Sequence, residues 1–278
     1  MRKYGRRLLY ALAGVMLLLA LFMLTCRDFL YTRVYPVFKR YEGLRIQREL
    51  DDYKLLDDGG FIIRYTDGDE ASALKLRDIA NEYGGCVSDF FGISREEPVE
   101  IILFPHETIL KGMLRIPQDQ SAMGAYAGGR INLLSPNRFV DINQDIDSFD
   151  NVFVHEYAHL AADDLARGNY PIWFTEGCAL YLEYDVLGYE WGSDLMDEDL
   201  SHITVDDLTY RFASVDEYKA YRASFLIVRG LVEGYGKMNL TGMLDKLGKG
   251  VSFEQALAEV YGLNTSELQG FLKSQKND

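Results

Sequence analysis

The chain has 278 residues, of which 48% are hydrophobic and 26% charged, and its formal net charge is −14. This length allows a globular unit large enough to enclose a catalytic core. The acidic charge excludes nucleic acid as an expected partner, because the chain has no surplus of basic side chains to displace counterions from phosphates.

The first apolar segment, Leu8–Cys26, holds 19 consecutive uncharged residues between Arg7 and Arg27. As a helix it would be about 28 Å long, which matches the hydrocarbon core of a bilayer. A cleaved signal peptide would have a shorter apolar core and a small-x-small cleavage site, a pattern that this segment lacks. The sequence therefore predicts one transmembrane helix over residues 8–26, with lipid as its partner.

The orientation of this predicted span follows from what flanks it. Four basic residues precede the span and four follow it within about 15 residues, so the positive-inside rule alone does not decide. A short tail over residues 1–7 is easily retained, whereas long domains translocate largely regardless of charge. We therefore expect a single-pass membrane protein with a cytoplasmic tail and an extracytoplasmic C-terminal domain.

Residues 27–59 are predicted to form a juxtamembrane stem. Basic side chains alternate there with aromatic ones, an arrangement suited to lipid headgroups. An ordinary solvated helix is the alternative. The aromatic residues are Phe29, Tyr31, Tyr35, Phe38 and Tyr41.

Residues 60–200 are predicted to form an α+β unit with a mixed sheet, because short β-type runs alternate with longer helical ones. Glu70–Phe91 has helical periodicity interrupted at Gly84-Gly85, and a further helix is expected from Asp147 or Ser148 to Leu165. Pro171 suits the first turn of the next helix. The expected strands are Phe61–Tyr65, Val99–Phe104 and Ile131–Leu134, and the helix opened by Pro171 covers Ile172–Leu187.

Residues 201–278 are predicted to form an all-helical C-terminal subdomain, because apolar residues recur there at helical spacing. The expected helices are Asp216–Tyr235, Leu240–Leu247, Phe253–Tyr261 and Ser266–Lys273.

Cysteine is sparse: Cys86 and Cys178 could be bridged in an oxidising compartment, but two separate buried thiols are the favoured interpretation.

The segment Val154-His-Glu-Tyr-Ala-His-Leu160 places two imidazoles, His155 and His159, four residues apart on one helical face. Two metal ligands on a rigid helix then require a third. Glu156 is offset by about 100° around the helix, where it can act on a metal's water without ligating the metal. A chance pairing of two histidines with an unrelated glutamate is the alternative.

A carboxylate lies within the apolar stretch that follows, seventeen residues beyond His159. Glu176 would be costly to bury unpaired, whereas a metal ligand is not. The segment from Pro171 to Tyr181 reads Pro-Ile-Trp-Phe-Thr-Glu-Gly-Cys-Ala-Leu-Tyr.

Together these segments resemble the gluzincins, the thermolysin-like clan, and specifically the peptidase MA-like families with a Pro-x-Trp-x-x-Glu-Gly-x-Ala-x-Tyr motif. The resemblance implies a zincin-like fold and a metallopeptidase acting on peptides. It also implies one Zn²⁺ ion held by His155, His159 and Glu176, with Glu156 as general base. The metzincin pattern does not fit, because Ala162 and Leu165 stand where it requires Gly and a third His.

The resemblance extends to two weaker features. The Gly-rich turn and strand from Gly124 to Leu134 look like the family's edge strand, which pairs with an extended peptide; glycines that merely permit a tight turn are the alternative. Tyr221 resembles the tyrosine that such enzymes direct at the oxyanion, with Tyr218 in reserve. A packing role is the alternative for both tyrosines.

One position departs from the family pattern. Thermolysin-like enzymes place an acidic residue four positions after the ligand Glu, to orient a histidine, and Leu180 stands there. Glu183, Asp163 and Asp150 are the candidates for this role. Two other functions stay open: an inactive zincin-like binding or regulatory module, and a zinc hydrolase acting on a non-peptide amide.

Overall fold

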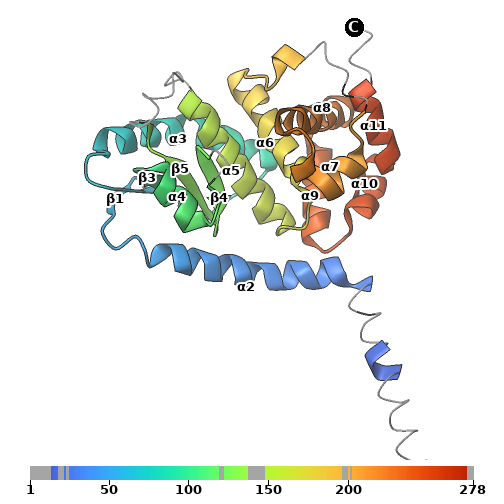
Figure 1. The fold of residues 1–278 in the computed structure, drawn as a ribbon, viewed down its shortest axis with the longest axis horizontal. Coiled ribbons are helices and arrows are strands. Elements are labelled where there is room, and N and C mark those ends of the chain that lie inside the picture. The colour runs from blue at the N-terminus through green and yellow to red at the C-terminus, as the bar shows by residue number, and fades with distance from the viewer. Residues whose placement is uncertain are drawn as a thin grey trace, which may run out of the picture.

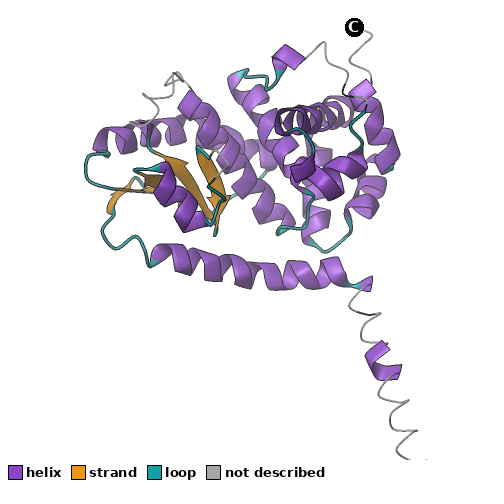
Figure 2. Ribbon diagram, viewed as in Figure 1, coloured by secondary structure: helices purple, strands orange, loops and turns teal. Residues whose placement is uncertain are grey.

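A computed structural model of the chain describes residues 14–17, 22, 25–118, 122–136, 148–195, 200 and 202–273. A long helix, α2 (Arg27–Gln47), runs along one side of a body with two lobes (Figure 1). All strands of the described part lie in one lobe, and the other lobe is helical (Figure 2). The predicted α+β class is therefore confirmed for the described residues.

The predicted transmembrane segment lies mostly outside the described residues, as does the whole of the tail over residues 1–7. Among the helices of the described part, none combines the length and the apolar character that crossing a membrane requires. The span over residues 8–26 stays a prediction from sequence.

The sheet has five strands in the order β1-β2-β3-β5-β4. The inner pairs β2–β3 and β3–β5 are parallel, and the outer pairs β1–β2 and β4–β5 are antiparallel. The predicted mixed sheet is thus confirmed, with β4 as an edge strand. The strands are β1 (Lys54–Asp57), β2 (Phe61–Tyr65), β3 (Val99–Phe104), β4 (Gly124–Ala127) and β5 (Arg130–Leu134).

Helix α3 (Glu70–Phe91) is continuous, so the interruption expected at Gly84-Gly85 was wrong. A Cβ atom on Gly84 would lie 2.5 Å from Cζ of Phe61. The glycine therefore lets α3 pack closely on β2, and the tertiary contact outweighs the lower helix propensity of glycine.

Three helices position the candidate site. Helix α5 (Ser148–Ala166) packs on β4, β5 and α3, and α6 (Ile172–Leu187) lies between α5 and α8 (Glu217–Tyr235). A Cβ atom on Gly177 of α6 would lie 2.4 Å from the backbone oxygen of Ser224 on α8. Only glycine permits this approach of the two helices.

After residue 200 every regular element among the described residues is helical. Four short elements were absent from the sequence prediction: β1, β4, α4 and α7. Thr204 and Asp207 form a capping box at the start of α7, a signal that the sequence contains. The remaining helices are α4 (Glu107–Leu114), α7 (Val205–Arg211), α9 (Lys237–Gly248), α10 (Phe253–Tyr261), α11 (Thr265–Lys273) and two 3₁₀ turns, Ser193–Leu195 and Phe212–Ser214.

The inner face of α2 packs on three turns, each with a glycine at positive φ. Gly250 lies against the backbone of Phe29, Gly168 against the ring of Tyr35, and Gly128 against Gly43. These turns belong to both lobes. Helix α2 is therefore a fixed part of the body and not a fully solvated helix, whereas the juxtamembrane stem over residues 27–59 stays a prediction.

The two cysteines of the body are not bridged. Cys178 is buried and free, as expected, but Cys86 is free and exposed, so its predicted burial was wrong.

Candidate active site

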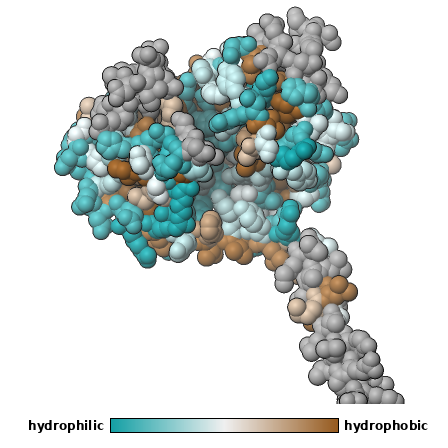
Figure 3. Space-filling model, in the orientation of Figure 1, coloured by the Kyte–Doolittle hydropathy of each residue, from teal (hydrophilic) through white to brown (hydrophobic). Residues whose placement is uncertain are grey.

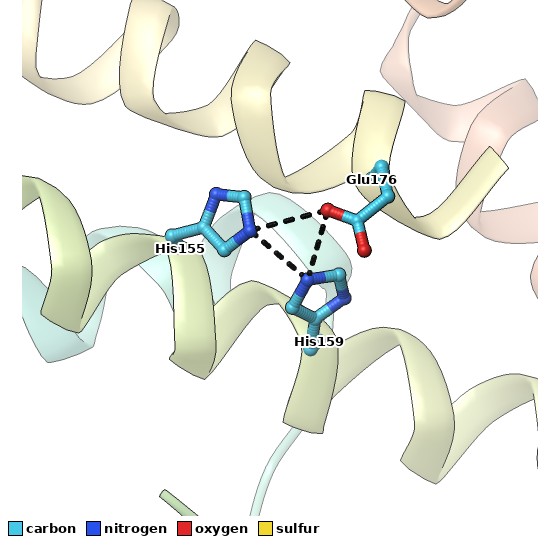
Figure 4. A group of neighbouring side chains, drawn as sticks. All are labelled: His155, His159 and Glu176. Atoms are coloured by element: carbon cyan, nitrogen blue, oxygen red, sulfur yellow. Dashed lines mark hydrogen bonds and ion pairs between the residues drawn. The ribbon is translucent and has the colours of Figure 1, made fainter. Parts of the chain in front are cut away.

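The two histidines of α5 and the glutamate of α6 face one another across the contact between these helices (Figure 4). The Nε2 atoms of His155 and His159 are 3.1 Å apart. Oε2 of Glu176 lies 3.4 Å from Nε2 of His155 and 3.5 Å from Nε2 of His159. The fold thus brings together three donor atoms that are separated by up to 21 positions in sequence.

The donor set fits a metal ion. Ligands of a tetrahedral zinc ion, with bonds of about 2.0–2.1 Å, lie about 3.3 Å from one another. The three separations here are within a few tenths of an ångström of that value. Oε2 of Glu176 is buried and makes no hydrogen bond within the described part of the chain, and its neighbours are the two imidazole nitrogens. A buried carboxylate oxygen of this kind is costly unless positive charge compensates it.

The charges of the site support a cation. Burial alone would raise the pKa of Glu176, but the imidazoles of His159 and His155 lower it overall. Burial opposes protonation of His155, yet Glu176 and Glu183 raise its pKa well above the usual value. The surrounding carboxylates therefore stabilise positive charge at the point where the three donors meet.

Each histidine is held by a second residue of α6. Nδ1 of His155 lies 2.6 Å from Oε1 of Glu183, and Nδ1 of His159 lies 2.8 Å from Oγ1 of Thr175. If each Nδ1 donates its proton there, each Nε2 is left free to ligate. Of the three candidate orienting residues, Glu183 is the one bonded to a histidine, whereas Asp163 bonds Lys39 and Tyr126. Thr175 was missed, because nothing in its sequence context distinguishes it.

Glu156 lies next to this cluster and against the edge strand. Burial raises its pKa, while the charges of His155 and His159 oppose that rise. A Cβ atom on Gly124 would be 2.9 Å from Cγ of Glu156, so the glycine at the start of β4 permits the strand to approach the glutamate.

A cavity of about 760 Å³ opens over the cluster. Tyr221 on α8 lines it, is half-buried, and makes no hydrogen bond within the part of the chain described. Burial and the charge of Glu176 raise its pKa, so its hydroxyl stays protonated. The hydroxyl of Tyr218 donates instead to Asp194, and the geometry therefore favours Tyr221. Other lining residues are His155, Glu156, Leu180, Glu183, Trp191 and Asp216.

The sequence model of the peptidase MA superfamily matches residues 87–275. Among solved structures, the chain is similar to an M1 zinc metallopeptidase mutant from Deinococcus radiodurans, at 16% identity and a TM-score of 0.44. It is also similar to such a mutant bound to a Tyr-Ser-Ala substrate, at 18% identity and a TM-score of 0.42. In both cases 80% of this chain and 50% of the other chain are covered, so this chain spans about half their length. The comparison with curated proteins gave no significant match.

Proposed function

The chain belongs to the peptidase MA superfamily, and we propose that it acts as a membrane-anchored zinc metallopeptidase. His155, His159 and Glu176 would hold one zinc ion. Glu156 is proposed as the general base and Tyr221 as an oxyanion donor.

One observation carries this proposal: the three donor atoms form a triangle with sides of 3.1, 3.4 and 3.5 Å beside a buried glutamate at the foot of a cavity. The ligands come from two helices fixed by their mutual packing, so little rearrangement is needed to bind the ion. A binding module would need the triangle, but it would not need Glu156 at its side.

A zinc ion bound here would lower the pKa of its water towards about 7 and polarise a scissile carbonyl. Glu156 accepts a proton from the attacking water and donates it to the leaving amine. Its burial raises its pKa, which favours this role over that of a permanently ionised carboxylate. Tyr221, which stays protonated, donates its hydroxyl hydrogen to the oxyanion. Glu183 and Thr175 keep the two imidazoles in the ligating tautomer.

The substrate is proposed to be an extended peptide that pairs with β4. Among the described strands it pairs with β5 on one side only, and its first residue, Gly124, lines the cavity beside Glu156. Backbone pairing there would align a peptide with the proposed base irrespective of its side chains.

The proposal is tested on the purified full chain by zinc analysis and a peptide library. We expect one zinc ion per chain and cleavage that a chelator removes and added Zn²⁺ restores. Bound zinc without cleavage of any peptide would instead indicate a binding module, and turnover of non-peptide amides alone would indicate another hydrolase.

Replacing Glu183 with Gln is expected to weaken zinc affinity about 10- to 100-fold, as losses of the partner of a ligating histidine do. The amide keeps the size of the side chain but removes the charge 2.6 Å from Nδ1 of His155. Competition with a chromogenic chelator measures the change. Asp185→Asn, an exposed carboxylate on the same helix, is the matched control, and equal affinities for both variants would contradict the assignment.

The membrane part of the proposal is supported by sequence: Leu8–Cys26 has the length and composition of a single span. We propose that the C-terminal domain lies outside the cytoplasm. A C-terminal reporter that is active only in the cytoplasm would contradict this sidedness.

A further inference from the structure

The outward face of α2 is apolar, and no other element of the described part of the chain covers it. Five residues spaced three or four apart share this face, as helical geometry requires, and each is between 52% and 70% exposed. Figure 3 shows this face as brown along the lower edge of the body. A contiguous apolar stripe of this kind marks an interaction site. The residues are Val34, Val37, Phe38, Tyr41 and Leu44.

The fully exposed charges that flank this stripe along α2 are basic. Arg33 and Arg40 are exposed there, whereas the acidic residues of α2, Asp28 and Glu42, are partly buried. Just after the helix, Arg48 and Glu49 are both exposed. The chain as a whole carries a net charge of −14. An apolar stripe edged by arginine on an otherwise acidic protein is complementary to an anionic lipid surface.

A cavity of about 550 Å³ lies beside the stripe, between α2, the β4–β5 turn and the end of α5. Arg40 and Arg167 line it and are both exposed, and neither has an ion pair within the described residues. The carboxylates of Asp163 and Asp164 also line it, but both are paired with Lys39. Two guanidinium groups free to bind at one cavity suit a phosphate headgroup.

The course of the chain points to the same occupant. The uncharged segment Leu8–Cys26 ends at the residue before α2. If that segment spans a bilayer, α2 starts at the bilayer surface, and its apolar face is the one that the body leaves open. The inner face cannot reach lipid, because it is packed on Gly128, Gly168 and Gly250.

We propose that α2 lies flat on an anionic bilayer, with its apolar stripe among the headgroups, and fixes the direction in which the active site faces. Lys39 of α2 binds Asp163 near the end of α5, whereas Val152 near its start lines the active-site cavity. Eleven residues of helix separate these positions, about 16 Å at 1.5 Å per residue. In this arrangement the active-site cavity at Val152 is held away from the end of α5 that contacts α2, and so away from the bilayer. This inference rests on the proposed membrane anchoring and not on the peptidase activity.

The test uses the full chain reconstituted in vesicles of phosphatidylcholine and phosphatidylglycerol, with lipids brominated at shallow or deep acyl positions. One variant carries Val37→Trp, on the stripe. The matched control carries Met238→Trp, at an equally exposed position near the start of α9. For Val37→Trp we expect the emission maximum of the added tryptophan to shift to the blue and its fluorescence to be quenched, most strongly by bromines at the shallow positions. For Met238→Trp we expect neither change.

Three outcomes would overturn the proposal. The first is that the added tryptophan of the Val37→Trp variant is not quenched, although the chains co-float with the vesicles on a density gradient. The chain would then be anchored in the membrane without α2 contacting the bilayer. The second is quenching that does not weaken when phosphatidylglycerol is omitted, which would remove the role of the arginines. The third is that the added tryptophan of the Val37→Trp variant is shielded from the brominated lipids while the chains cross-link to one another. That result would assign the stripe to contact with a second copy of the chain. None of these measurements requires peptide turnover.

Discussion

Replacing Glu156 with Gln is expected to lower kcat for peptide hydrolysis about 10²- to 10⁴-fold, the usual contribution of a general base. The amide cannot accept a proton from water, yet it fills the same space against Gly124. Zinc content should be unchanged, because Glu156 is not among the three clustered donors. Turnover of the best library peptide and metal analysis of the same sample measure the two effects.

Glu156→Asp serves as the control for this prediction. It keeps the carboxylate and shortens the side chain by one methylene, so it should retain more activity than the Gln variant. A Gln variant with the kcat of the unaltered chain would rule out Glu156 as the base. A loss of zinc in that variant would show that the ligand triangle is wrongly assigned.

The elements that sequence alone located best are those with strong local signals. The strands β2 and β3 begin and end at the predicted residues, because each is a short β-branched and apolar run. Helix α6 also matches, since Pro171 stands at its start and Gly188 adopts the left-handed conformation at its end. Strand β4 has no such signal: Gly-Ala-Tyr-Ala becomes a strand only by pairing with β5 and packing on α5.

The candidate site divides in the same way. The sequence predicted the cluster of His155, His159 and Glu176, because helical spacing fixes two of them and a carboxylate in an apolar helix singles out the third. Glu183 could not be chosen over Asp163 without the structure, although one signal was present. It lies seven residues after Glu176, two helical turns along the same face of α6. Thr175 depends wholly on how α5 and α6 pack.

The role of Asp163 illustrates a limit of motif reasoning. It lies one turn beyond His159 on α5, which made it a candidate to orient a histidine. Its buried carboxylate instead accepts bonds from Lys39 at 2.7 Å, from the hydroxyl of Tyr126 at 2.5 Å and from that of Tyr170 at 3.2 Å. It therefore joins α2 and the edge strand β4 to the end of α5.

Replacing Asp163 with Asn is expected to cost about 3 kcal/mol of folding free energy, the lower end of the range for breaking a buried ion pair. The substitution leaves Lys39 with one carboxylate fewer. The amide of the new side chain also cannot accept all three of the hydrogen bonds that Asp163 accepts. Lys39 keeps Asp164 at 3.0 Å, which limits the loss. Denaturant unfolding of the full chain in detergent measures it.

Asp164→Asn is the matched control, because the neighbouring carboxylate binds the same lysine, and also Arg95, from a more exposed position. Its loss should cost no more than about 1 kcal/mol. Equal costs for the two variants would contradict the role of Asp163. The region that matches the superfamily begins at residue 87, well after α2. A large loss of folding free energy confined to the Asp163 variant would therefore mean that α2, although outside that region, stabilises the matched domain. The same carboxylate would also hold the edge strand beside Glu156, through Tyr126.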